Sequence, residues 1–339
     1  MAHSDELRLI ARVARMYHLD DIKQAEIARR LRISQAGISR LLKRARDEGI
    51  VRISVEAPSG TFPELEDRLR RRFALDEIVI AECVEDREEQ ILSRIGEAAA
   101  QYLEMTVQAG EVIGISSWSE SLLRMVDHLD AGRRAGAAQV VQILGGMGNP
   151  SVQAHATALT TRLARLTGAT PLLLATQGIA GSIEARDVLV SDPYVAGTIA
   201  RFGALTMAVV GVGAVEPSKL LADSGNIFTA KELRELASLR AVGDICLHFF
   251  DADGLPIRSP VEGRVIGITL EALRLVPRVV GVAGGRRKVQ ALLGALRGRL
   301  LDVLITDQFT AMRIDALSSQ ETGPGACGPS GSRATPMPT

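Results

Sequence analysis

Short apolar runs rich in β-branched residues alternate with longer segments of helical periodicity over residues 77–318. The short runs have the length of strands, and the segments between them have the amphipathic pattern of helices. Strands are expected at residues 78–81, 112–115, 140–144, 172–175, 205–210, 245–250, 279–282 and 303–306, and helices at residues 88–105, 119–129, 152–166, 231–238, 286–296 and 308–317. This alternation predicts an α/β domain with a mostly parallel sheet, and such sheets bind ligands at the carboxyl ends of their strands.

Length and composition limit the other possibilities. The 339 residues suit two domains, and balanced charge (40 basic and 40 acidic side chains) with 46% hydrophobic residues is typical of a globular protein. Cys83, Cys246 and Cys327 lie too far apart in sequence for a disulfide framework or a cysteine-rich zinc site. The longest apolar run, residues 207–215, is too short to span a bilayer, and the N-terminus has no secretory-signal pattern. We therefore expect a cytoplasmic protein with no membrane partner.

Positive charge is concentrated near the N-terminus. Residues 22–46 contain eight cationic side chains and one acidic residue, Glu26. In a chain of zero net charge, this density suggests a polyanionic partner. An arginine-rich surface that is merely solvated is the alternative, and the charge count alone does not decide between them.

Helical periodicity in the same region favours DNA. One apolar stripe runs through residues 7–17, a second short helix is expected at residues 24–31, and Ser34 can cap a third. The apolar positions of the third helix are spaced to face the other two, Gly49 can end it, and residues 50–55 alternate like a strand. The pattern predicts a helix-turn-helix with a small wing, in preference to a three-helix packing module.

The outward side chains of the third helix are arranged for a DNA groove. Polar residues come first, where a recognition helix touches base edges, and cations come later, where phosphates are held. Gln35 could bind adenine and Arg40 guanine, while Ser39 could contact a base or a phosphate. The candidate DNA contacts are Gln24, Ser34, Gln35, Ala36, Ser39, Arg40, Lys43, Arg44 and Arg46.

These residues also carry a family resemblance. Residues 24–31, 33–34, 38–45 and 48–51 resemble the DNA-binding head of the SorC family of bacterial transcriptional regulators, which are sugar-binding relatives of the DeoR group. One departure is Gly37, where the family usually has a side chain. Glycine there costs the helix about 1 kcal/mol relative to alanine and removes a possible base contact.

The rest of the chain divides at composition changes. Residues 57–60 interrupt the pattern like a hinge, so we expect a DNA-binding domain at 1–56 and a linker helix at 57–75. Leu65, Leu69 and Phe73 form a narrow stripe in that helix, which could pack on its own domain or on a second subunit. The effector domain is expected at 76–318, and the Gly-, Pro- and Ser-rich residues 319–339 are expected to be a disordered tail.

The sequence contains no complete nucleophile elbow, dinucleotide fingerprint or Walker A loop. The sequence after Gly114 has Trp118 where a nucleophile elbow needs its second glycine, and Glu216 replaces the third glycine of a dinucleotide fingerprint. There is no Gly-Lys pair for a Walker A loop, and the five histidines lack metal-ligand spacing. We expect no catalytic residue, no metal and no cofactor.

Several loops could instead hold a small polar ligand. Ser116, Ser117 and Trp118 follow an expected strand and suit sugar hydroxyls or a phosphate, although a serine-rich cap over a buried tryptophan is the alternative. A second loop has two glycines that allow close backbone approach, followed by a lysine; its candidates are Gly284, Gly285 and Lys288. Asp251 directly follows an apolar run and could bind sugar hydroxyls, although residues 251–254 could simply form a hairpin turn. Gln177 is a weaker candidate of the same kind, and Asp307 could be a helix cap.

The resemblance to the SorC family extends over residues 5–318. It implies a Rossmann-like, sugar-phosphate-isomerase-like α/β effector domain that binds a phosphorylated sugar, in a dimer or tetramer on operator DNA. Carried onto this sequence, it favours Ser116, Ser117, Gln177, Asp251 and Lys288 as effector contacts. This chain has Ser119 and Glu120 where the family usually has glycine and often a basic residue. Because Glu120 would repel a phosphate, an uncharged sugar or polyol remains open.

The sequence thus predicts a regulator of a carbohydrate catabolic operon, controlled by a sugar, polyol or sugar phosphate. A sugar-phosphate isomerase with a DNA-binding head is the enzymatic alternative, with Asp251 or Glu120 as its base, but no second acid–base partner is evident. A nucleoid-binding architectural protein is a third possibility and would bind DNA without a ligand response.

Overall fold

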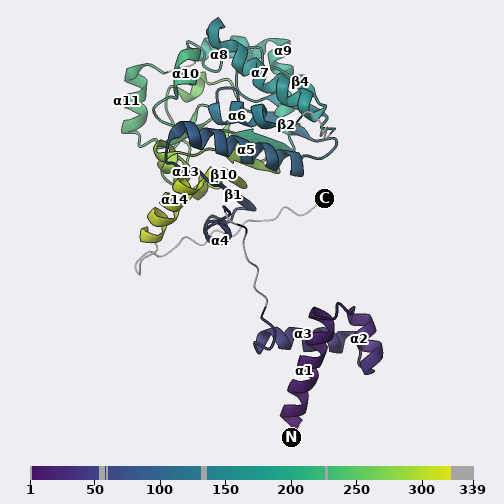
Figure 1. Ribbon diagram of the computed structural model, residues 1–339. Coiled ribbons are helices and arrows are strands. Elements are labelled where there is room, and N and C mark those ends of the chain that lie inside the picture. The colour runs from purple at the N-terminus through teal and green to yellow at the C-terminus, as the bar shows by residue number, and fades with distance from the viewer. Residues whose placement is uncertain (1, 53–57, 59, 131–135, 226–227, 322–339) are drawn as a thin grey trace, which may run out of the picture. The chain divides into compact units, whose positions relative to one another are not determined.

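The computed structural model describes residues 2–52, 58, 60–130, 136–225 and 228–321 (Figure 1). The chain forms two compact units, Met1–Pro58 and Ser59–Thr339. No helix in the described part of the chain combines the length and the hydropathy needed to cross a membrane.

The first unit contains three helices, α1 (Ala2–His18), α2 (Gln24–Leu31) and α3 (Gln35–Asp47). Ser34 caps α3 by accepting a hydrogen bond from the Gly37 backbone N–H, and Gly49 follows α3 with a φ of +70°, as predicted. The buried core of the unit comprises Ile10, Val13, Ala14, Ile27, Ile38, Leu42 and Ala45. Residues 50–52 form no strand, and residues 53–55 of the predicted wing lie outside the described residues.

The tight connection between α2 and α3 accounts for the glycine at position 37. Arg32 ends α2 in the left-handed region, with a φ of 55°, which turns the chain sharply toward α3. A Cβ on Gly37 would lie 2.7 Å from the Ile33 side chain and 3.2 Å from Ser34 Oγ. A larger residue would therefore have to displace Ile33, which packs against the core of the unit.

The second unit is built on a seven-stranded sheet. Its strands are β1 (Glu77–Ala81), β2 (Val112–Ile115), β3 (Gln139–Gln142), β4 (Thr170–Leu172), β5 (Met207–Val210), β9 (Val279–Val282) and β10 (Val303–Asp307). They lie in the order β1-β10-β9-β5-β2-β3-β4, and every pairing is parallel. The predicted parallel α/β architecture is confirmed.

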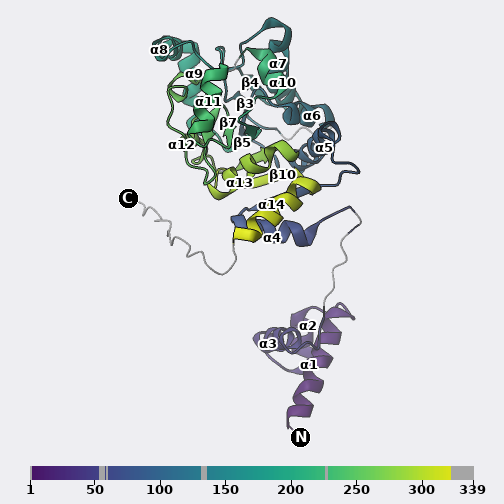
Figure 2. The same ribbon diagram turned by 90° about the vertical axis from the view of Figure 1, so that its left-hand side faces the viewer.

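Helices cover both faces of this sheet (Figures 1 and 2). Alternate residues of β5 show the division: Met207 and Val209 pack into one hydrophobic cluster, and Ala208 and Val210 into the other. The cluster that contains Met207 and Val209 also contains buried residues of α5 (Glu88–Thr106), α6 (Glu120–His128) and α7 (Pro150–Thr167). The cluster that contains Ala208 and Val210 also contains buried residues of α4 (Pro63–Phe73), α11 (Ala230–Ser238), α13 (Val289–Arg297) and α14 (Gln308–Glu321).

The amphipathic helix α4 packs on its own domain. Leu65 and Leu69 are buried in the same cluster as the sheet, and Arg72 forms an ion pair with Asp315 of α14 at 2.9 Å. Of the two possibilities for its apolar stripe, packing within the subunit is the one observed. Helix α14 itself continues to Glu321, past the boundary expected at residue 318, and residues 322–339 of the predicted tail lie outside the described residues.

The prediction of one strand at residues 245–250 was wrong. The segment is a hairpin of β7 (Gly243–Ile245) and β8 (His248–Phe250), and β6 (Gly213–Ala214) adds a third antiparallel strand. Its two-residue turn, Cys246 and Leu247, has φ values of 53° and 66°, and neither residue type signals such a turn. The sequence also gave no indication of the short helices α8 (Ile183–Ser191), α9 (Pro193–Ala200), α10 (Lys219–Ser224) and α12 (Leu270–Leu273).

Candidate functional site

The strand order places a crevice between β2 and β5. From β2 the chain continues outward through β3 to β4, whereas from β5 it continues in the opposite direction through β9 to β10. At such a reversal the connections leave the neighbouring strand ends on opposite faces of the sheet, and α/β proteins bind ligands there. The loops that follow β2 and β5 meet at this point, where the Ser116 hydroxyl accepts a hydrogen bond from the Gly211 N–H at 3.3 Å.

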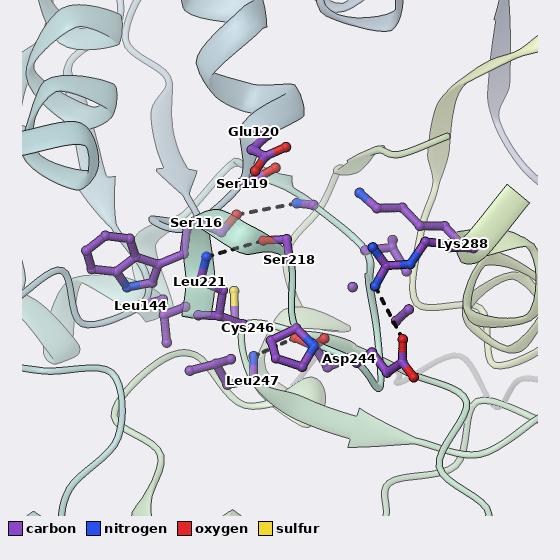
Figure 3. Close-up of a pocket in the computed structure, with 18 of the residues that line it drawn as sticks. Ser116, Ser119, Glu120, Leu144, Ser218, Leu221, Asp244, Cys246, Leu247 and Lys288 are labelled. Carbon is purple, nitrogen blue, oxygen red and sulfur yellow. Dashed lines mark hydrogen bonds and ion pairs between the residues drawn. The ribbon is translucent and has the colours of Figure 1, made fainter. Parts of the chain in front are cut away.

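A cavity of about 90 Å³ occupies this crevice (Figure 3). It is bounded by the loops after β2 and β5, by the β7–β8 turn and by the residues after β9. Its polar and charged lining residues are Glu88, Ser116, Ser119, Glu120, Glu216, Ser218, Asp244, Arg287 and Lys288. Trp118, Leu92, Leu144 and Leu221 supply apolar surface. Hydroxyls, carboxylates and cations beside an aromatic ring suit a small polyhydroxylated ligand.

Asp244 is the most deeply buried acid of the cavity, with 8% of its surface exposed. Burial raises the pKa of its carboxyl from 3.8 to about 6, against the opposing effects of the Leu247 N–H and of Lys288. One oxygen, Oδ2, accepts a hydrogen bond from that N–H at 3.0 Å and so stabilises the strained turn. The other oxygen, Oδ1, lies where a Cβ on Gly213 would approach to 2.0 Å, so only glycine fits opposite this carboxylate.

Lys288 extends into the cavity opposite Ser116 and Glu120 (Figure 3). Burial lowers the pKa of its ammonium group, and the nearby carboxylates of Glu120, Glu88 and Asp244 oppose that shift. Within the described residues its ammonium group makes no hydrogen bond or ion pair. The three N–H bonds of this group are thus free to donate to a ligand.

The structure brings together three of the sequence-predicted effector residues. Ser116, Trp118 and Lys288 line the cavity. The indole N–H of Trp118 donates to the Gly145 carbonyl at 3.0 Å, which fixes the ring in the wall.

The other predicted effector residues lie outside the lining of this cavity. The Ser117 hydroxyl is fully buried and donates to the Leu144 carbonyl at 2.6 Å. Gln177 pairs through its backbone with Gly146 and Met147, and Asp251 accepts hydrogen bonds from the backbone N–H groups of its own turn.

The glycine pair after β9 has a structural role. The Gly285 N–H donates to the Asp307 carboxylate at 3.0 Å and to the Thr310 hydroxyl at 2.7 Å, and Gly284 packs against the same carboxylate. Asp307 also accepts from the Thr310 N–H at the start of α14, as a helix cap does. This arrangement fixes the loop that carries Lys288.

Sequence reasoning missed Asp244, the loop after β5 and the Cys246–Leu247 turn. The sequence favoured Asp251, which directly follows the apolar pair Phe249-Phe250. Only the hairpin shows that Asp244 is at the cavity and Asp251 is not: Asp244 lies in the middle of β7, opposite Phe249, whereas Asp251 follows the end of β8.

In the first unit, one face of α3 is open to solvent. Gln35, Ala36, Ser39, Arg40, Lys43 and Arg46 are exposed, and Ile38, Leu42 and Ala45 face the core. Arg40 Nε donates to the Ala36 carbonyl at 3.3 Å, which leaves its outer nitrogens available. Ser34 is exposed but engaged in capping, and Gln24 is partly buried at the start of α2.

Arg44 differs from the other candidate DNA contacts. Its guanidinium pairs with Glu6 of α1 and with Glu48 at 2.7 Å. The hydrogen bonds to Glu6 and Glu48 raise the pKa of the Arg44 guanidinium, and the bond to Glu6 has the larger effect. It therefore links α3 to α1, and its capacity to bind phosphate is partly used within the unit.

No group of three or more His, Cys, Asp or Glu side chains in the described part of the chain is arranged to hold a metal ion.

Comparisons with known proteins identify the family. A family model described as "Putative sugar-binding domain" matches residues 59–314. The sorbitol operon regulator of Klebsiella pneumoniae is 30% identical over 315 residues, which cover 92% of this chain and 98% of that protein. The crystal structure of full-length SorC from the same species matches with a TM-score of 0.68 and 29% identity, over 91% of this chain and 98% of that chain. A structure described as "Putative sugar-binding domain of transcriptional regulator DeoR", from Pseudomonas syringae pv. tomato, is 41% identical, with a TM-score of 0.59, over 74% of this chain and 97% of that chain. The chain therefore belongs to the SorC family of transcriptional regulators.

Proposed function

We propose that this protein is a cytoplasmic regulator of a carbohydrate catabolic operon, which binds operator DNA through α3 and a sugar, polyol or sugar phosphate in the cavity at β2 and β5. The supporting observation is that one chain carries both an exposed polar and cationic helix face and a polar cavity at the switch point of its sheet. The Klebsiella relative is named for a sorbitol operon, which supports a carbohydrate as the effector.

On the DNA side, Gln35, Ala36, Ser39, Arg40 and Lys43 would lie in the major groove. Binding as a dimer or tetramer would provide the two half-sites that useful specificity requires. The strand of the predicted wing stays a prediction only for residues 53–55, because residues 50–52 form no strand. On the effector side, Ser116, Trp118, Asp244 and Lys288 would contact the ligand, and a difference in ligand affinity between two subunit arrangements would change DNA affinity.

A sugar-phosphate isomerase is the weaker reading. Asp244 could accept a proton, but the relatives that match nearly the full chain are named as regulators and not as enzymes.

The test combines a thermal-shift screen of sugars, polyols and their phosphates with fluorescence anisotropy on promoter DNA from the protein's own operon. A ligand that binds the native state raises the melting temperature, and the same compound should change DNA affinity. Lys288→Ala should lose both responses and keep DNA binding, whereas the exposed Lys231→Ala should keep all three. A protein that ignores the promoter with and without these compounds would refute the proposal.

A further inference from the structure

The cavity has an excess of negative charge. Four carboxylates line it, those of Glu88, Glu120, Glu216 and Asp244, against the two cations Arg287 and Lys288. Arg287 lies 3.6 Å from Glu216, so these two charges largely cancel. Lys288 is then the one remaining cation among the described lining residues, and it is attracted by three carboxylates, Glu120, Glu88 and Asp244.

The N-terminus of α6, which adjoins the cavity, is partly occupied by the chain itself. A helix N-terminus attracts anions through its free N–H groups and its dipole. At α6, however, the Ser119 hydroxyl caps the Leu122 N–H, and Glu120 places its own carboxylate in the first turn. A phosphate at this position would meet the satisfied Leu122 N–H group and the negative charge of Glu120, which Figure 3 shows beside Ser119.

The side chains that line the cavity offer more hydrogen-bond acceptors than donors. Each ionised carboxylate accepts only and offers about four lone-pair sites, whereas a phosphate dianion has no hydrogen to donate. Hydroxyl groups of a ligand donate and accept, so they can bind the carboxylates of Glu120 and Asp244 while accepting from Lys288. Ser116, Ser119 and Ser218 can act in either sense.

We infer that the effector of this protein is an uncharged polyhydroxylated molecule, a free sugar or a polyol, and that Glu120 and Asp244 exclude its phosphorylated form. The inference rests on the proposed function, because it concerns the same cavity. It specifies the class of ligand within the wider range of sugars, polyols and sugar phosphates.

The experiment compares matched pairs on the full-length protein. A hexitol, a pentitol, a ketohexose and an aldopentose are each titrated beside their terminal phosphate monoesters, with melting temperature and operator affinity as readouts. At least one free compound should bind, with its phosphate ester weaker by at least about tenfold. Glu120→Gln should reduce the ratio of the two dissociation constants, because it removes one repulsive charge, and the exposed Glu271→Gln should leave this ratio unchanged.

Inorganic phosphate provides a second probe that does not depend on which carbohydrate binds. At ionic strength matched with chloride, it should not raise the melting temperature of the wild-type protein. Saturable stabilisation by phosphate that is lost in Lys288→Ala would overturn the inference.

The remaining outcomes separate the two proposals. Equal or tighter binding of a phosphate ester would overturn the exclusion of phosphate and leave the proposed carbohydrate regulator intact. Binding of neither form of any pair, with no effect on operator affinity, would overturn the carbohydrate effector and the inference together.

Discussion

Replacing Asp244 by asparagine should stabilise the effector domain at neutral pH. The carboxyl is buried, and its pKa in the folded protein is about 6, compared with 3.8 when it is exposed. The folded state therefore binds more protons than the unfolded state between these pH values. The stability that protonation confers is fully present below the unfolded pKa and is lost as pH rises through the folded pKa.

The size of the effect follows from that difference. One pKa unit corresponds to about 1.4 kcal/mol, so the change from 3.8 to about 6 is worth about 3 kcal/mol. Asparagine resembles the protonated acid, and its amide oxygen can still accept from the Leu247 N–H. Asp244→Asn should thus gain little near pH 4 and up to about 3 kcal/mol above about pH 7.

The single tryptophan provides the assay. Trp118 is the only tryptophan in the chain and lines the same cavity, so its fluorescence follows the effector domain during denaturant unfolding. The urea midpoints of wild type and Asp244→Asn are compared across the acid-to-neutral range, with the exposed Asp253→Asn as a matched control. A gain in stability of Asp244→Asn that does not change with pH, or a loss of stability at every pH, would refute the electrostatic reasoning. The variant should also lose effector affinity, as substitutions that relieve strain at functional sites commonly do.

Other substitutions test the remaining parts of the structure. Arg40→Ala should weaken operator binding by about 1–3 kcal/mol and should weaken binding to random DNA less, in paired anisotropy titrations. Equal losses of affinity on the two DNAs would mean that Arg40 contacts only phosphate. Arg44→Ala should affect operator binding less than Arg40→Ala, because Arg44 is already paired with Glu6 and Glu48. Ser34→Ala should destabilise the first unit by about 1 kcal/mol through loss of the α3 cap, measured by circular dichroism; unchanged melting would contradict the capping role. Gly213→Ala should cost about 1–3 kcal/mol and abolish the effector response, because the new Cβ would collide with Asp244; a normal titration would show that the loop can move aside.

Local patterns in the sequence were sufficient to predict the helices of the first unit. The 3.6-residue period identified Ile38, Leu42 and Ala45 as the buried face of α3, and Ser34 and Gly49 marked its ends. The same local signals located most strands of the sheet, because a parallel strand buried on both faces is a short continuous apolar run. Short helices such as α8, which buries none of its residues, have no such stripe and were missed.

The effector site depended on features that no local pattern contains. Strand order decides that the loops after β2 and β5 adjoin, and pairing in the β7–β8 hairpin decides that Asp244, and not Asp251, lines the cavity. The pairing of Arg44 with Glu6 likewise joins residues 38 positions apart. The sequence by itself thus determined the longer helices and most strands of the parallel sheet, since periodicity is set by neighbouring residues. Only the tertiary structure decided which side chains converge on the ligand, because that depends on contacts between segments distant along the chain.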